Sequence, residues 1–303
     1  MSAVITPFQG TEPFNTASFN NRISQINTGF SYVSNPNLLD NWYFANPVNQ
    51  RGQTSYGQTQ QYSIDRWMIT NDYAYVDVAD GYITLRGNDV NGFGGIIEKL
   101  ESSIKNALLG KTVTLSFFAK LYTTCAIAGQ QITPTDNFEL YSITFLSSSA
   151  DYVLFAAVTA VTTGAKIADI LAAKLELGPT QTLAHREGDR WVLNEVPNYG
   201  EQLRRCQRYF YRFNSHAYGW TYNNNIVNCL IPLPVTLRAT PVITLYESGT
   251  INTAAGDAAM SSYEVKNIAS NGLIIDLHNT ANAFTTGTPV VWHNFNMAIS
   301  ADL

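Results

Sequence analysis

The alternation of apolar and polar residues with a period of two is the feature that most constrains this chain. It is clearest in the stretch 111–121, where one face of an extended strand collects Val113, Leu115, Phe117, Ala119 and Leu121. The intervening positions are mostly Thr, Ser and Lys. Because successive side chains of a strand point to opposite faces, this stretch predicts a β-strand.

Comparable runs recur along most of the chain. They fall at 73–78, 82–85, 138–145, 152–161, 174–177, 226–231, 242–246, 263–268, 273–277 and 290–299. Clusters of Gly, Asp, Asn and Pro separate them, as is typical of turns between strands. Many short strands without long intervening helices predict a mainly β fold that contains an antiparallel β-sandwich.

Two short helices are expected between the strands. The stretch 101–109 ends at Gly110, which favours a helical turn with a glycine at its C-terminal end. In the stretch 198–210, one side of a helix collects Leu203, Cys206, Tyr209 and Phe210. The arginines on its other sides are either a functional patch or, more commonly, a solvated face.

A helical seam is predicted ahead of the β region. Its apolar residues are spaced by four, three, four and three positions: Phe19, Ile23, Ile26, Phe30 and Val33. This is the a/d spacing of a coiled coil, and large residues at both positions favour more than two helices. A seam of about two heptads is too short to be stable alone. Its narrow apolar stripe favours self-association, and packing on the chain's own β domain is the alternative.

The length of 303 residues favours two domains with a terminal extension. We expect an N-terminal attachment arm and helix over 1–35 and a β-sandwich over 36–185. A linker, a short helix and a C-terminal β domain are expected over 186–303. The boundary between the two β domains is placed in the polar connector 182–197, which contains Gly and Pro.

Composition excludes several classes of partner. Charged residues make up only 14% of the chain, so much of its surface must consist of Ser, Thr, Asn, Gln and Tyr. The net charge is −5 and Lys and Arg form no long run, so nucleic acid is not an expected partner. Neither a secretion signal nor a run of about 18 apolar residues is present, so we expect synthesis in a cytoplasm and no membrane insertion.

The sequence carries no enzyme motif. It contains no nucleophile motif, no phosphate-binding glycine loop and no His-Glu-x-x-His pattern, so we expect no catalytic residues, no cofactor and no metal. Cys125, Cys206 and Cys229 are too scattered for a disulfide framework or a zinc site, and we expect them to be reduced and mostly buried. Two carboxylates of a glycosidase need only spatial proximity, so a glycan-degrading enzyme is kept as an alternative.

The stretch 37–52 contains many large apolar residues beside Asn, Asp and Pro. This composition predicts a strand or a packed arm that lies across a sheet. It reads Asn-Leu-Leu-Asp-Asn-Trp-Tyr-Phe-Ala-Asn-Pro-Val-Asn-Gln-Arg-Gly, and the stretch 62–67 reads Tyr-Ser-Ile-Asp-Arg-Trp. Together they resemble the opening of tail-fibre and receptor-binding proteins of bacteriophages and prophages of gut bacteria. The motif Leu-Arg-Arg-Cys-Gln-Arg-Tyr-Phe at 203–210 belongs to the same resemblance. This resemblance implies that the chain forms trimers.

A second resemblance concerns the first β domain. The order of an Asn-Leu-Leu start, Gly-Lys-Thr-Val-Thr-Leu-Ser-Phe-Phe-Ala-Lys at 110–120 and Ala-Lys-Leu-Glu-Leu-Gly at 173–178 is similar to jelly-roll carbohydrate-binding modules. The resemblance covers about half of the chain. It implies a jelly-roll β-sandwich and sugar binding.

The candidate binding surface lies in the stretch 214–225. Tyr218, Trp220 and Tyr222 alternate there, and a strand would place all three rings on one face. Beside them stand the amides of Asn223, Asn224 and Asn225. Aromatic planes stack on sugar rings while amides bond hydroxyl groups. The commoner alternative is that the rings pack into the β core or a trimer interface. The tryptophans assigned to packing are Trp42, Trp67, Trp191 and Trp292.

Taken together, the resemblances imply an adhesive, non-enzymatic component of a phage virion. We expect a homotrimeric tail fibre or receptor-binding protein that joins other tail or baseplate proteins through its N-terminus. Its β domains would bind a host cell-surface polysaccharide. A glycan-degrading enzyme of the virion and a structural adaptor or head fibre without a ligand are the alternatives.

Overall fold

The computed structural model describes residue 20 and residues 34–57, 61–70, 74–87, 94–148, 152–158, 161–269, 272–281 and 283–303. The predicted seam of Phe19, Ile23, Ile26, Phe30 and Val33 lies outside the described residues. Two compact units make up the chain. Unit 1 comprises the described residues of Met1–Pro47, Gln53–Ser63 and Trp67–Pro197, and unit 2 comprises those of Val48–Gly52, Ile64–Arg66 and Asn198–Leu303.

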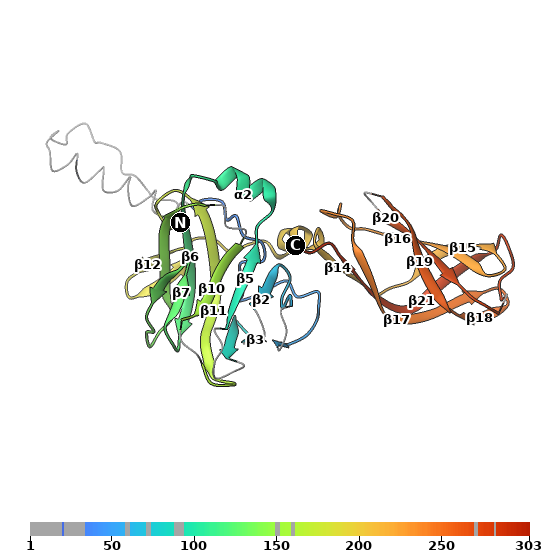
Figure 1. Cartoon of the computed structure of the whole chain (residues 1–303), viewed down its shortest axis with the longest axis horizontal. Helices are drawn as coiled ribbons and strands as arrows, with labels where there is room; N and C mark the ends of the chain where they lie inside the picture. Colours follow the sequence, from blue (N-terminus) through green and yellow to red (C-terminus); the bar gives the residue numbers. More distant parts are fainter. Residues whose placement is uncertain are drawn as a thin grey trace, which may run out of the picture. The chain divides into compact units, whose positions relative to one another are not determined.

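The fold is mainly β, as predicted. Strands account for 54% of the structure and helices for 7%, and the ribbon of each unit consists largely of sheet (Figure 1). Every strand pair in the described part of the chain is antiparallel. Among the described residues, no helix has the length and apolar character needed to cross a membrane.

Unit 1 contains the predicted β-sandwich. Its first sheet has the order β1 (Ser55–Gly57), β3 (Ala74–Ala79), β4 (Tyr82–Gly87), β11 (Lys166–Leu177), β6 (Thr112–Leu121) and β9 (Glu139–Leu146). Its second sheet has the order β2 (Trp67–Ile69), β5 (Gly95–Lys99), β10 (Tyr152–Ala157), β7 (Cys125–Ile127) and β8 (Gln130–Ile132). A separate hairpin joins β12 (Ala184–Glu187) to β13 (Arg190–Leu193). The predicted helical turn is α2 (Ser102–Leu108), and Gly110 follows it with a φ of +71°.

Aromatic side chains from both sheets form the core of unit 1. The ring of Phe117 on β6 lies 5.0 Å from that of Phe155 on β10, centroid to centroid, and 6.5 Å from that of Trp67 on β2. Phe44 meets Trp67 edge to face at 5.0 Å. The two sheets are therefore packed face to face. Trp67 is fully buried and Trp42 almost so, which confirms their assignment to packing.

The N-terminal end of the described chain is laid along β11, as predicted for a packed arm. The backbone N–H groups of Leu38 and Phe44 donate to the carbonyl oxygens of Leu175 and Leu171, over 2.9 and 2.8 Å. Tyr43 forms an isolated bridge with Ala172. The arm therefore pairs with the stretch 171–175 of β11, next to the stretch of β11 that pairs with β4.

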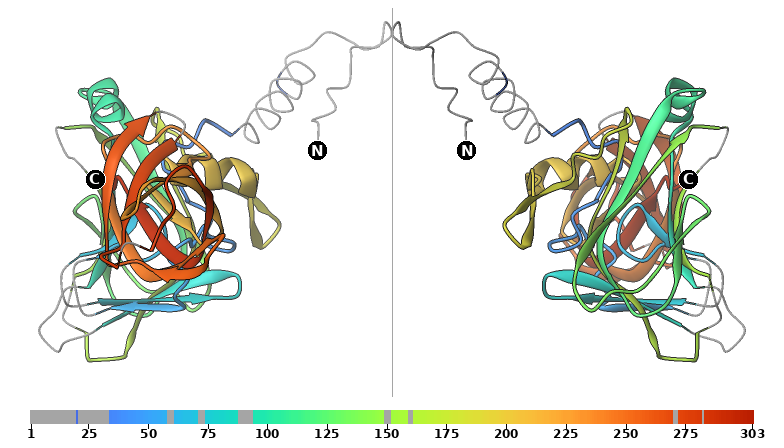
Figure 2. Two further views of the ribbon diagram at one scale, coloured as in Figure 1. Left: turned by 90° about the vertical axis from the view of Figure 1, so that its right-hand side faces the viewer. Right: turned by 90° about the vertical axis from the view of Figure 1, so that its left-hand side faces the viewer.

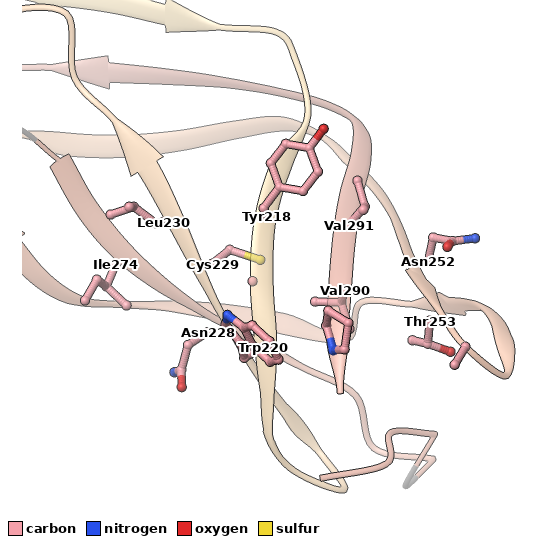
Figure 3. Close-up of a pocket in the computed structure, with 13 residues that line it drawn as sticks. Tyr218, Trp220, Asn228, Cys229, Leu230, Asn252, Thr253, Ile274, Val290 and Val291 are labelled. Carbon is pink, nitrogen blue, oxygen red and sulfur yellow. The ribbon is translucent and has the colours of Figure 1, made fainter. Parts of the chain in front are cut away.

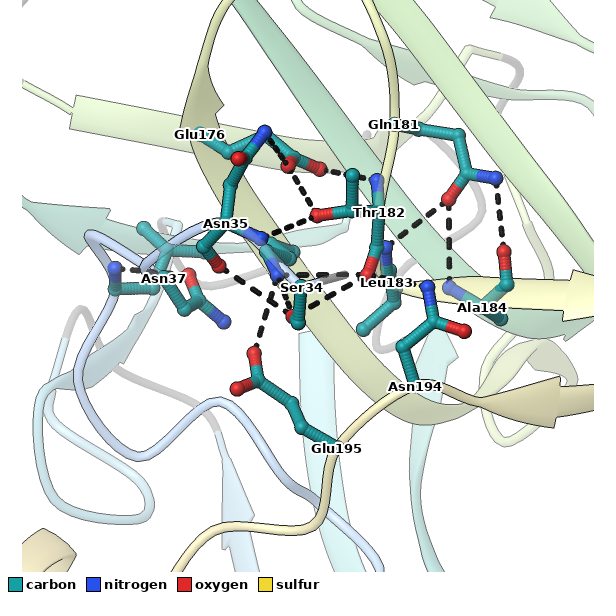
Figure 4. A network of polar contacts seen from close by, with 12 residues as sticks. Ser34, Asn35, Asn37, Glu176, Gln181, Thr182, Leu183, Ala184, Asn194 and Glu195 are labelled. Carbon is teal, nitrogen blue, oxygen red and sulfur yellow. Dashed lines mark hydrogen bonds and ion pairs between the residues drawn. The ribbon is translucent and has the colours of Figure 1, made fainter. Parts of the chain in front are cut away.

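A buried polar network ties this arm to β11 (Figure 4). Glu176 accepts hydrogen bonds from Asn35 Nδ2 at 3.0 Å and from the backbone N–H of Thr182 at 2.7 Å. Lys174, whose side chain is fully buried, lies 3.1 Å from the carboxylate of Glu195 and donates to Ser34 Oγ. Burying a charge is costly unless partners compensate it: Lys174 has an ion pair and hydrogen bonds, and Glu176 accepts several hydrogen bonds.

Unit 2 is built on one large sheet. Its order is β18 (Gly256–Ala259), β17 (Val242–Thr253), β21 (Pro289–Ser300), β15 (Ala217–Asn223), β16 (Ile226–Pro232), β20 (Gly272–His278) and β19 (Ser262–Ala269), and β14 (Phe210–Phe213) also pairs with β21. These strands curl into a half-barrel, seen in orange and red in the left view of Figure 2. The predicted helix is α3 (Tyr199–Gln207), whose N-cap Asn198 accepts a hydrogen bond from the Glu201 N–H at 3.2 Å.

The inner face of this sheet carries the core of unit 2. Trp292 stacks on Phe295 with centroids 3.6 Å apart, and Phe213 stacks on the same ring at 5.5 Å. Trp292 is fully buried, as predicted. Its indole N–H donates to the carbonyl of Ser248 at 2.8 Å, so its polar atom is satisfied inside the core. The core on the inner face leaves the opposite face of the sheet open to solvent at β15.

Candidate ligand-binding face

Strand β15 divides its side chains cleanly between the core and solvent. Ala217, Gly219 and Thr221 are buried, whereas Tyr218, Trp220 and Tyr222 are 71%, 63% and 68% exposed. All three predicted rings therefore share one face and point away from the core. The interpretation that they pack into the β core of this chain is wrong, because the period of two places the small residues inward instead. The other alternative, that the three rings pack at a trimer interface, stays a prediction.

Gly219 sets the spacing of the strand that carries these rings. A Cβ atom at this position would collide with the carbonyl oxygen of Asn228 and would lie 2.8 Å from the Sγ of Cys229. Only a residue without a side chain lets β15 approach β16 so closely. The glycine between Tyr218 and Trp220 is thus part of how the face is built.

Pairing across the sheet brings further side chains beside the rings. Tyr218 lies opposite Leu230 on β16 and Val291 on β21. Trp220 lies opposite Asn228 on β16 and Pro289 on β21. Adjacent strands are about 4.8 Å apart, so these side chains form one continuous surface.

This surface is hollowed into a groove of about 770 Å³. It runs over β15, β16 and β21 and reaches the end of β17 (Figure 3). Its lining is aromatic, aliphatic, amide and hydroxyl: Tyr218, Gly219, Trp220, Asn228, Cys229, Leu230, Asn252, Thr253, Ala254, Ile274, Pro289, Val290 and Val291. Flat apolar walls with a few placed polar groups are typical of a small-molecule or sugar site.

A charged cluster lies beyond the groove on the β20 side. Asn228 donates an amide N–H to Asp276, which is buried. Lys266 lies 3.7 Å from Asp276 and 2.6 Å from Glu264. The hydrogen bond from Lys266 holds the pKa of Glu264 below its usual value. The ammonium group is therefore compensated by two carboxylates outside the groove.

The predicted site residues fall into two sets. Tyr218 and Trp220 line the groove, and Tyr222 extends the same exposed face along β15. Asn223, Asn224 and Asn225 instead shape the turn between β15 and β16, where the Asn223 Oδ1 accepts the backbone N–H of Asn225 at 2.8 Å. None of these three lines the groove, and their amides serve the turn.

Several lining residues have no signal in the local sequence. Asn252 and Val291 reach the groove only because β17, β21 and β15 are neighbours in the sheet. Asn228 and Leu230 alternate on β16 with the buried Val227, Cys229 and Ile231. The alternation on β16 indicates that Asn228 and Leu230 face outward, but only the pairing of β15 with β16 places them in the groove.

The described part of the chain contains no cluster of three or more His, Cys, Asp or Glu side chains that could hold a metal ion. The three cysteines are free and buried, as predicted. Burial raises the pKa of the Cys229 thiol to about 12, so it stays protonated beneath the groove. Cys229 contributes to the floor of the groove as a small apolar group.

Known proteins offer only a distant structural match to this chain. No protein-family model matches the chain, and a search of curated proteins gave no match. Among solved structures, the N-terminal CBM22-1–CBM22-2 tandem domain of Xyn10C from Paenibacillus barcinonensis is similar with a TM-score of 0.27 and 10% identity. That match covers 88% of this chain and 98% of the other. A similarity this low supports no inference about fold or function.

Proposed function

We propose that the chain is an adhesive component of a bacteriophage or prophage virion that attaches to a host-surface glycan through the groove along β15. The observation that carries the glycan part is the row of three exposed rings, Tyr218, Trp220 and Tyr222, on one face of a strand. The phage part rests on the resemblance of 37–52, 62–67 and 203–210 to tail-fibre and receptor-binding proteins.

The physical argument starts from the exposed apolar area. Contiguous apolar patches on a protein surface mark interaction sites more often than single exposed residues do. Here Leu230, 57% exposed, adds to the rings. A planar ring matches the apolar face of a pyranose, and the hydroxyls at the sugar's rim can bond the amides of Asn228 and Asn252. Binding without hydrolysis is proposed because the groove lining offers stacking and hydrogen bonding.

The rest of the proposal concerns assembly. The chain forms a homotrimer through its N-terminal seam, joins other tail or baseplate proteins there, and is located on the virion after synthesis in the host cytoplasm. Each stacked sugar contributes on the order of a kcal/mol, so a single site binds weakly. Several copies on one fibre would then raise the effective affinity.

The test replaces Trp220 by Ala and measures retention on a panel of immobilised polysaccharides and adsorption to host cells. Tyr246→Ala is the matched control, because Tyr246 is an exposed aromatic of the same unit, 57% exposed, outside the groove. We expect Trp220→Ala to abolish binding and Tyr246→Ala to preserve it.

Two results would overturn the proposal. If the wild-type chain is retained by no polysaccharide, the face does not bind glycan. If Trp220→Ala changes the oligomeric state in sedimentation, the rings belong to a subunit interface and the receptor site lies elsewhere.

A further inference from the structure

The groove along β15 is flanked by two asparagines that are held in the same way. On one side, Asn228 donates an amide N–H to Asp276. On the other side, the Asn252 Nδ2 donates to the Asp257 Oδ1 over 2.8 Å. The two amides come from β16 and β17, on opposite sides of β15 and its neighbour β21.

The two aspartates fix which atom of each amide is left for a ligand. Asp276 lies on β20, which pairs with the edge of β16 that faces away from β15. Asp257 lies on β18, which pairs with the edge of β17 that faces away from β21. A primary amide has its donor and acceptor on opposite branches. With each Nδ2 donating to its aspartate, each Oδ1 is the amide atom left without a hydrogen-bond partner among the described residues. The groove thus presents two hydrogen-bond acceptors beside its aromatic rings.

The groove itself is uncharged, and the charged groups bonded to its two asparagines are carboxylates. None of the thirteen side chains that line it in the described part of the chain is charged. Behind the two asparagines stand carboxylates, of which Asp276 lies 3.7 Å from Lys266 and Asp257 lies 3.9 Å from His293. An anionic sugar here would meet amide oxygens backed by carboxylates, with no cation in the groove to compensate its charge.

Resting on the function proposed above, we infer that this groove selects uncharged glycans and rejects anionic ones. Hydroxyl groups of a neutral sugar donate to the Oδ1 atoms of Asn228 and Asn252 while the sugar ring stacks on Tyr218 and Trp220. Asp276 and Asp257 are positioning residues, because they act only through the asparagines. The ligand class is a polysaccharide without carboxylate, sulfate or phosphate groups along the bound stretch.

The experiment compares the affinity of the whole chain for neutral polymers and for their charged derivatives. The probes are uncharged glucans, galactans and mannans, each paired with its carboxymethyl derivative, and the affinity is measured at low and at high salt. We expect binding to at least one neutral polymer with an affinity that salt leaves unchanged, and no binding to its carboxymethyl form. Asn228→Ala should weaken neutral binding about five-fold, as the loss of one hydrogen bond does. Asn267→Ala, an exposed asparagine of the same unit outside the groove, should leave it unchanged.

A reversal of charge preference gives a second readout. Leu230→Lys places an ammonium group beside Tyr218, where Leu230 is exposed. This variant should gain salt-sensitive binding to the carboxymethyl polymer. Trp220-dependent, salt-sensitive binding of the wild-type chain to the anionic polymer would overturn the inference and leave the proposed glycan binding intact. Failure of every polymer to bind in a Trp220-dependent way would overturn the proposed function itself.

Discussion

At the scale of the residue, Trp220 and Trp292 illustrate two opposite uses of one side chain in the same unit. Trp292 is fully buried and stacks on Phe295, whereas Trp220 is 63% exposed. We expect Trp292→Ala to lower the free energy of unfolding by about 3–5 kcal/mol, the usual cost of truncating a buried aromatic. Trp220→Ala should change it by no more than about 0.5 kcal/mol. Urea unfolding of both variants measures this, and equal losses would contradict the assignment.

Asp65 is predicted to make unit 2 less stable as the pH rises. Burial is the main cause that raises its pKa to about 6, although Arg51 acts in the opposite direction. Between about pH 4 and pH 6 the folded chain keeps a proton that the unfolded chain releases, so stability falls across this window and is level above it. The unfolding free energy of the wild type minus that of Asp65→Asn should therefore decrease from pH 4 to pH 6. An increase would mean that attraction to Arg51 outweighs burial.

The candidate site was only partly predictable at this scale. The alternation of Tyr218, Trp220 and Tyr222 is local, and it placed the three rings on one face of a strand. Whether that face is inner or outer depends on which neighbours pack against it. Asn252 enters the groove through two other strands, which no local pattern encodes. Proximity in sequence groups Asn223, Asn224 and Asn225 with the rings, but these residues form the turn between β15 and β16 and do not line the groove.

At the scale of the element, β15 depends on Gly219. An added Cβ would collide with the carbonyl oxygen of Asn228, so Gly219→Ala should push β15 away from β16. Overpacking of this kind costs about 1–3 kcal/mol. We expect both a lower unfolding free energy in urea and weaker glycan retention, because the pairing that aligns Trp220 with Asn228 is disturbed. Unchanged stability would show that β15 can move without cost.

The strands with strong alternation were predicted well, and the short ones were not. The strand predicted at 111–121 is confirmed as β6. The pattern did not reveal that both faces of β6 are buried: Thr114 and Ser116 on its polar face are covered as well. Strands β1, β2, β7 and β8 have three residues each, too few to show a period. Such strands exist because longer neighbours pair with them.

At the scale of the whole molecule, the make-up of unit 2 depends on contacts between distant parts of the sequence. Val48–Gly52 and Ile64–Arg66 belong to it with the C-terminal part of the chain. Within the unit, Arg51 Nη2 lies 2.8 Å from Asp302 Oδ2, and the guanidinium of Arg66 lies 3.6 Å above the ring of Tyr209. Composition and turn signals divide a sequence into consecutive stretches, so they do not predict a unit built from separated ones.

The last prediction separates the strength of one groove from that of the assembly. Replacing both Ile23 and Ile26 by Asp places charges in the predicted seam, so the chain should sediment as a monomer. Because the groove lies within unit 2 of each chain, affinity for a soluble neutral oligosaccharide should stay unchanged. Retention on a surface dense in the same glycan should fall by on the order of 100-fold or more, since linked sites rebind at high effective concentration. A wild-type chain that is already monomeric, or a double variant that adheres equally well, would show that adhesion does not depend on several grooves acting together.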